Sequence, residues 1–186
     1  PDQTQKAESD LPVVVIPSTT ATITADGKLD EDAWKKAPVL SFFDSLGRNV
    51  ATKYETKLRL LYDQNNLYVS FEAVDQDISC PFSKRDDPIY DHEAVELFIM
   101  PKVKAPGLGP YIELQASPKG IIFDAAFTGR RRGMDTSFNA GQTVGTTIDG
   151  TLNQDDGKDR GFISEWIVPF KKMRGVSAAP KAGEEW

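Results

Sequence analysis

The chain has 186 residues, of which 39% are hydrophobic and 27% are charged, and its formal net charge is −6. This composition and length are typical of one folded domain. The acidic balance argues against nucleic acid as a partner, because proteins that bind nucleic acid generally present a basic surface. No segment approaches the roughly 20 consecutive apolar residues of a membrane-spanning helix.

The chain begins with a polar segment, PDQTQKAESD. It holds no basic stretch followed by an apolar run, so it does not read as a signal peptide. We expect residues 1–17 to be a polar leader, either the spacer of an exported protein or an ordinary frayed terminus. Residues 18–186 are then expected to form one domain.

A short helix is the first predicted element, over residues 29–37. It has acidic residues in its first turn and lysines in its last, which suits the helix dipole, and Pro38 ends it. A second helical turn is predicted at residues 169–174. Near the end of the sequence, PKAG is typical of a turn. We therefore expect the sequence to stop at Trp186, the first residue of a further strand, and the last strands of the domain to be missing.

Between these helices the hydrophobic pattern has a period of two residues, which is typical of strands. The turn-forming residues 63–66, DQNN, join the first two strands in a hairpin, and a Pro-Lys-Gly turn at 118–120 joins two later ones. The predicted strands are 57–62, 67–74, 94–100, 111–117, 121–127, 144–149 and 162–168. Short strands without a long helix indicate an all-β protein, an antiparallel β-sandwich of jelly-roll type with one or two short helices.

Five ordered motifs resemble one family, the carbohydrate-binding module family 9-like (CBM9-like) domains. They are DGKLDEDAW (26–34), KLRLLYDQNNLYVSFEAVDQDI (57–78), RDDPIYDHEAVELFI (85–99), YIELQASPKGIIFD (111–124) and GTLNQDDGKDRGFISEWIVPF (150–170). The resemblance implies a jelly-roll sandwich, carried mostly by exported bacterial proteins. It also implies binding to sugar chain ends, with bound calcium as structural support.

In the founding members of this family, two aromatic side chains hold a sugar whose hydroxyls bond to charged and amide groups. The resemblance places the first aromatic at or near Tyr90, the carboxylate at Glu96 and a polar group near Gln115, and it puts the second aromatic beyond Trp186. Strand alternation independently places Glu113 on the same face as Gln115. We therefore expect a sugar groove lined by Tyr90, Glu96, Glu113 and Gln115.

Each of these residues also has an ordinary structural interpretation. Glu96 could form a salt bridge with Arg59 or Arg85. Glu113 and Gln115 could simply belong to the solvated face of an antiparallel sheet.

Acidic residues gather after the second predicted strand. Calcium is bound by six to eight oxygen ligands, and Asp75, Asp77 and Asp87 could supply some of them, with Asp124 a further candidate. No EF-hand spacing is present. The alternative is a solvated acidic loop.

Cysteine and histidine occur once each, as Cys80 and His92, so a disulfide within the chain and a Cys/His zinc cluster are excluded. We interpret Cys80 as a small buried side chain and His92 as an exposed loop residue. The basic run 130–132 is interpreted as a solvated loop, with an anionic glycan, lipid head group or acidic partner as the alternative.

We therefore expect a non-catalytic module that requires no cofactor and binds sugar or glycoconjugate ends weakly, outside the cytoplasm. A glycosidase built on Glu96, Glu113 and Glu165 is one alternative. A second is an envelope interaction or assembly module, whose open sheet edge pairs with another protein or with a copy of itself. Haem electron transfer is a remote third, because no spacing pairs His92 with Met100 or Met134 as axial ligands.

Overall fold

The computed structural model describes residues 13–42, 52, 54–101 and 109–186. Eight strands account for nearly all the regular structure of these residues. They are β1 (Leu40–Ser41), β2 (Thr56–Tyr62), β3 (Asn66–Ala73), β4 (Val95–Ile99), β5 (Tyr111–Ala116), β6 (Ile122–Phe127), β7 (Thr143–Asp149) and β8 (Gly161–Pro169).

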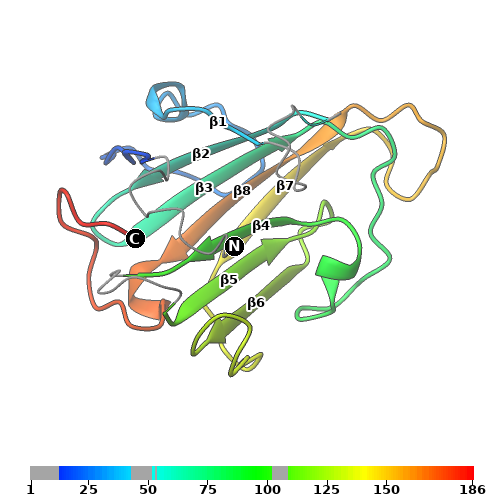
Figure 1. Ribbon diagram of the computed structural model, residues 1–186. Coiled ribbons are helices and arrows are strands. Elements are labelled where there is room, and N and C mark those ends of the chain that lie inside the picture. The colour runs from blue at the N-terminus through cyan, green and yellow to red at the C-terminus, as the bar shows by residue number, and fades with distance from the viewer. Residues whose placement is uncertain (1–12, 43–51, 53, 102–108) are drawn as a thin grey trace, which may run out of the picture.

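The strands form two antiparallel sheets that pack face to face (Figure 1). The larger sheet has five strands in the order β1-β2-β3-β8-β7, and the smaller has three in the order β4-β5-β6. This confirms the predicted all-β sandwich. Each predicted strand lies within two residues of an observed one, because the period-two pattern marks the strand interiors well.

Both predicted helices shrink to single 3₁₀ turns. The first is η2 (Trp34–Lys36) and the second is η4 (Phe170–Lys172), while η3 (Ile89–Asp91) was not predicted. Short helical segments are marginal without tertiary support, and here packing of one buried aromatic holds each of the two predicted turns. Residues 177–186 form turns and irregular backbone.

The leader can be judged only in part, because residues 1–12 lie outside the described residues. Residues 13–17 have no regular structure, and the chain then joins the sandwich next to β2. The Tyr62 amide donates to the Pro17 carbonyl at 3.2 Å, and the Thr19 amide donates to the Tyr62 carbonyl at 2.7 Å. The chain is therefore attached to the larger sheet from about residue 17.

The interior is filled by alternate residues of both sheets. Trp166 of β8 is fully buried, and its ring centroid lies 5.1 Å from that of Phe71 on β3. Its Nε1 donates to Ser164 Oγ at 2.7 Å, so the one polar atom of the indole is satisfied inside the core. From the smaller sheet, Ile112 and Leu114 of β5 pack into the same cluster.

Part of the outer face of the larger sheet is covered by residues 23–37. Ile23 and Trp34 pack against Leu61 of β2 and Tyr68 of β3 in a second apolar cluster. Trp34 thus anchors this segment on the sandwich.

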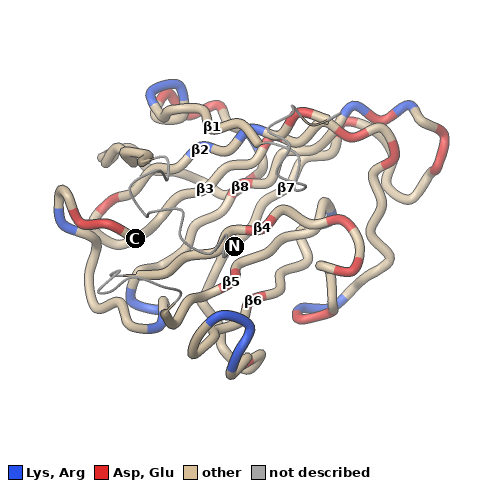
Figure 2. The backbone as a smooth tube through the Cα atoms, viewed as in Figure 1, with Lys and Arg blue, Asp and Glu red and all other residues tan. Residues whose placement is uncertain are grey.

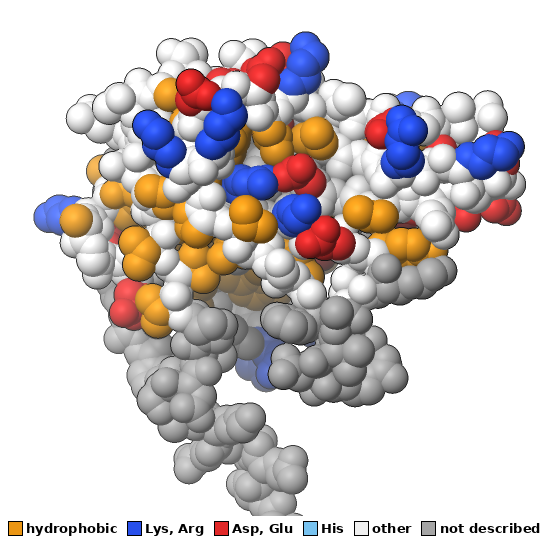
Figure 3. Space-filling view, turned by 90° about the horizontal axis from the view of Figure 1, so that it is seen from above, with side chains coloured by type: hydrophobic (Ala, Val, Ile, Leu, Met, Phe, Trp, Pro, Cys, Tyr) orange, Lys and Arg blue, Asp and Glu red, His pale blue; other side chains and the backbone are white. Residues whose placement is uncertain are grey.

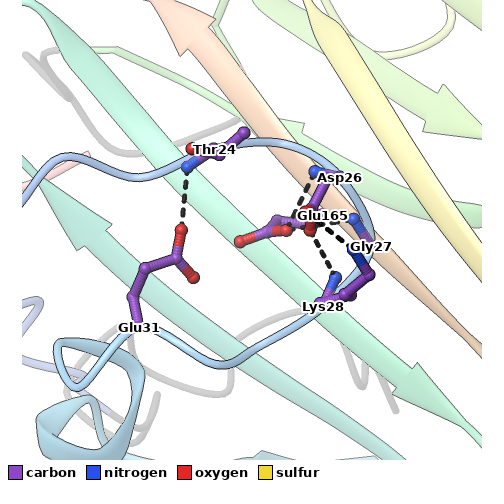
Figure 4. Close-up of polar contacts among 6 residues, drawn as sticks. All are labelled: Thr24, Asp26, Gly27, Lys28, Glu31 and Glu165. Atoms are coloured by element: carbon purple, nitrogen blue, oxygen red, sulfur yellow. Dashed lines mark hydrogen bonds and ion pairs between the residues drawn. The ribbon is translucent and has the colours of Figure 1, made fainter.

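Glu165 of β8 lies fully buried beneath this segment. One carboxylate oxygen accepts hydrogen bonds from the amides of Asp26, at 3.2 Å, and Gly27, at 3.1 Å (Figure 4). The other accepts from Trp34 Nε1 at 2.8 Å. Gly27 has a φ of +80°, and a Cβ at this position would lie 2.5 Å from the backbone of Thr146, so the loop approaches β7 too closely for any other residue.

Burial raises the pKa of Glu165 to about 6, and the neighbouring negative charge of Glu31 acts in the same direction. The hydrogen bonds from its three donors act in the opposite direction. In the unfolded chain its pKa returns to about 4.5. The folded state therefore binds more protons than the unfolded state between these two values, so the contribution of Glu165 to stability is lost as the pH rises through about 6.

We predict that the free energy of unfolding of the wild type, relative to Glu165→Gln, falls by about 2 kcal/mol between pH 4 and pH 7, since each pKa unit corresponds to about 1.4 kcal/mol. Urea denaturation of both proteins across this range measures the difference. Glu55→Gln serves as the control, because Glu55 is an exposed carboxylate directly before β2 of the same sheet. A difference that does not vary with pH would contradict the prediction.

Candidate functional site

The outer face of the smaller sheet brings the predicted residues together. In the β4–β5 register Glu96 lies opposite Gln115, and Phe98 lies opposite Glu113. Residues opposite one another in an antiparallel pair point to the same side of the sheet. Glu96, Glu113 and Gln115 therefore share one face, which confirms the alternation read from the sequence.

Strand β6 completes this face with apolar side chains. Phe123, Ala125 and Phe127 lie opposite Gln115, Glu113 and Tyr111, respectively.

The turn η3 covers one part of the face. Ile89 is fully buried there and packs in a cluster with Phe123, Ala125 and Phe127. The Tyr90 ring meets Phe123 edge-on, with centroids 5.1 Å apart, and 45% of Tyr90 stays exposed. Tyr90 is thus an exposed aromatic beside Phe123, the cross-strand partner of Gln115.

Aromatic rings continue along the uncovered part. Tyr111 stacks on Phe127 with centroids 4.6 Å apart and planes 4° apart, and Phe98 meets Tyr111 edge-on at 6.3 Å. Phe98 is 56% exposed, which is unusual for a phenylalanine on a strand. The sequence prediction omitted Phe98 from the site, although its alternation with Glu96 was a signal that could have found it.

Glu96 has no hydrogen bond or ion pair with any residue of the described ranges. The two arginines that were expected as alternative partners are engaged elsewhere. Arg59 pairs with Glu72, and Arg85 Nη2 lies 2.7 Å from Asp124 Oδ2. Burial raises the pKa of Glu96, and the charge of Glu113 raises it further. The salt-bridge interpretation of Glu96 is therefore wrong.

Glu113 is better compensated. The Tyr111 hydroxyl donates to Glu113 Oε1 at 3.2 Å. Burial raises the pKa of Glu113, while that hydroxyl and the positive charge of Arg131 act in the opposite direction. Arg131 belongs to the basic run 130–132, whose exposed side chains lie on a tight loop beyond β6 (Figure 2). The loop thus adds one positive charge beside Glu113.

Gln115 is almost completely buried, with 2% of its surface exposed. Its Oε1 atom has no hydrogen-bond partner among the described residues. An unpaired amide oxygen costs roughly 1–3 kcal/mol, so a partner from outside the chain would stabilise it. This position is not the solvated sheet residue that the alternative interpretation required.

The acidic residues predicted to bind calcium do not converge. Asp77 Oδ1 accepts from the Gly157 amide at 2.7 Å, and Asp75 Oδ1 accepts from the Asp77 amide at 3.0 Å. Asp87 accepts from two backbone amides in its own turn, which lowers its pKa. Across the described ranges no three His, Cys, Asp or Glu side chains gather as a metal-binding group. A calcium site formed by these three carboxylates is therefore not assembled.

Two hollows are described, and both lie away from this face. One of about 450 Å³ lies between residues 77–79 and 153–155. The other, of about 230 Å³, is on the larger sheet and is lined by residues of β2, β3, β7 and β8, including Lys57 and Arg160. Neither contains Tyr90, Glu96, Glu113 or Gln115, so the predicted groove is better described as an open face.

The remaining single residues behave as the sequence indicated. Cys80 is a buried free thiol, and His92 is exposed, with its ring near Ser79 Oγ. Glu165 lies on the other sheet beneath residues 23–37, so it cannot face Glu96 or Glu113 across a cleft. The glycosidase alternative therefore loses its third carboxylate. The described residues include no helix long and apolar enough to cross a membrane.

The described residues thus form a two-sheet antiparallel β-sandwich with one partly open outer face. Residues 25–106 match the model of a family described as "Carbohydrate family 9 binding domain-like", which confirms the resemblance seen in the sequence motifs. The matched family is described as binding carbohydrate, in agreement with the expectation of a binding module. No curated protein sequence matches the chain.

Solved structures support the same fold. A "putative carbohydrate-binding protein" from Bacteroides uniformis has a TM-score of 0.66 at 12% identity, over 88% of this chain and 76% of that one. A family 9 carbohydrate-binding module from Caldicellulosiruptor kristjanssonii in complex with cellotriose has a TM-score of 0.55 at 16% identity, over 85% and 68%. The module from that organism in complex with glucose has a TM-score of 0.53 at 16% identity, over 85% and 70%.

We predict that Glu113→Gln lowers the pKa of Glu96, because it removes the neighbouring negative charge that helps to raise it. Carboxyl ¹³C NMR as a function of pH measures this directly. Glu72→Gln, a change on the larger sheet, should leave the Glu96 titration unchanged. An unaltered Glu96 pKa in Glu113→Gln would mean that the two carboxylates do not interact.

Proposed function

We propose that the outer face of the β4-β5-β6 sheet binds carbohydrate, and that Glu96, Glu113, Gln115, Tyr90 and Phe98 form the site. One observation carries the proposal: Glu96 is half-buried without a partner among the described residues, on a face that also exposes Phe98. Sites with this combination suit sugars, which offer hydroxyl donors on their edges and apolar C–H groups on their faces.

The roles follow from the contacts. Hydroxyls donate to the Glu96 and Glu113 carboxylates, while the exposed rings of Phe98 and Tyr90 cover a pyranose face. Binding is weak, since an open face for one or two sugar units buries little surface and immobilises few groups favourably. The solved complexes with glucose and cellotriose at a related fold support this class of ligand.

The setting of the protein is part of the proposal. Relatives of this kind are carried mostly by exported bacterial proteins, so we place the protein outside the cytoplasm and assign it a non-catalytic role. Structural calcium is supported by the resemblance alone.

A second function has one observation in its favour. Strand β4 pairs only with β5, so within the described residues its other edge is open beside the site. An open edge of this kind can pair with a strand of another protein or of a second copy. The upper surface, by contrast, mixes charges of both signs with scattered apolar side chains and offers no broad patch of one kind (Figure 3).

We predict that titration with glucose and cello-oligosaccharides shifts the amide NMR signals of residues 90, 96, 98, 113 and 115. Phe98→Ala should weaken the affinity roughly three- to tenfold, because it removes an exposed ring from the sugar face. Val74→Ala is the control, because Val74 is also an exposed apolar residue and lies by the hollow on the larger sheet, away from the proposed site.

A folded protein that gives no shifts with any sugar would overturn the proposed site. Concentration-dependent mass in light scattering, lost when a proline replaces an outward-facing β4 residue, would then favour assembly through the β4 edge.

A further inference from the structure

The two carboxylates on the sugar face form an uneven pair. They are diagonal neighbours across the β4–β5 register, since Glu96 faces Gln115 and Phe98 faces Glu113. Diagonal neighbours of this kind lie within reach of each other's charge. Arg131 and the Tyr111 hydroxyl act on Glu113, whereas no described cation acts on Glu96. The negative charge left over is therefore centred on Glu96.

A neutral sugar would not compensate the negative charge of Glu96. A ligand that covers Glu96 takes away the water that solvates it, and the loss is costly unless the ligand returns a strong partner. A hydroxyl offers one neutral hydrogen bond, whereas an ammonium group offers a charge-assisted bond that is roughly twice as strong. The face therefore favours a ligand that carries positive charge next to Glu96.

The rings around Glu96 suit the same ligand. The exposed Phe98 lies on the same strand and the same face as Glu96. Tyr90 contacts Phe123, which lies opposite Gln115, and Gln115 lies opposite Glu96. Aromatic faces attract ammonium groups and also stack on the C–H groups of a sugar ring.

A separate observation also points to a donor-rich ligand. Gln115 lies directly opposite Glu96, and its buried Oε1 has no partner among the described residues. Two acceptors, one charged and one neutral, are thus adjacent on the face. An ammonium group with three N–H bonds can donate to more than one acceptor at once.

We propose that the ligand of this face is an amino sugar, such as a glucosamine unit of a de-N-acetylated glycan, with its protonated amino group on Glu96 and beside Gln115. This inference rests on the proposed function, because it names the class of sugar for the same site. Glu96 is the residue that selects the amine, and Phe98 holds the sugar ring. Glu113, compensated by Arg131, accepts a hydroxyl.

The test compares glucosamine with glucose and N-acetylglucosamine, which keep the ring but lack the positive charge. Affinities are measured by NMR titration of the wild type, Glu96→Gln and Glu55→Gln. Glu55→Gln removes one negative charge on the other sheet, so it controls for general attraction of a cation to an acidic protein. We expect wild type and Glu55→Gln to bind glucosamine about tenfold more tightly than the two neutral sugars. We expect Glu96→Gln to bind all three alike.

Equal affinities of the wild type for glucosamine and glucose would overturn the amino-sugar inference and leave the proposed function intact. No binding of any sugar by the folded protein would overturn both. If Glu96→Gln does not fold, the wild type alone decides the question. Its preference for glucosamine must shrink as salt is added, because a charge-assisted contact on an open face is screened, and a preference that ignores salt contradicts the inference.

Discussion

Each sheet of a sandwich buries one face against the other sheet. Its outer face is either covered by other segments of the chain or exposed to solvent. In this protein the two sheets differ in this respect. Residues 23–37 cover the part of the outer face of the larger sheet around Glu165, where Trp34 and two backbone amides hold its buried carboxylate. The smaller sheet has only η3 across one part of its outer face, so the rest stays open. The position of the candidate site follows from this difference in coverage.

The two buried or half-buried glutamates illustrate the physical contrast. Glu165 receives three hydrogen-bond donors from its own chain, so its charge is used to hold a segment in place. Glu96 receives none from the described residues and lies next to a second carboxylate. A partly buried charge without a partner lowers stability, and a ligand that supplies donors would offset that cost. The same residue type is structural on one sheet and available for binding on the other.

The basic run 130–132 gains a role only in this context. In the sequence it is an isolated cationic loop in an acidic protein. In the fold, Arg131 lies close enough to Glu113 to act on that carboxylate and leaves Glu96 uncompensated. The loop therefore makes the two carboxylates inequivalent, which matters for which ligand group each can accept. The exposed ring of the candidate site is Phe98, on the edge strand β4.

The local pattern of the sequence was enough to predict seven of the eight described strands, the hairpin turn at 63–66 and the shared face of Glu113 and Gln115. These features depend on alternation and turn chemistry, which act over a few residues. The partners of Glu96, the cover over Glu165 and the failure of Asp75, Asp77 and Asp87 to converge depend on contacts between residues far apart in the chain. Alternation states which side of a strand a residue occupies, but only the packing of the two sheets and their covering segments decides which sides are closed and which remain open to a ligand.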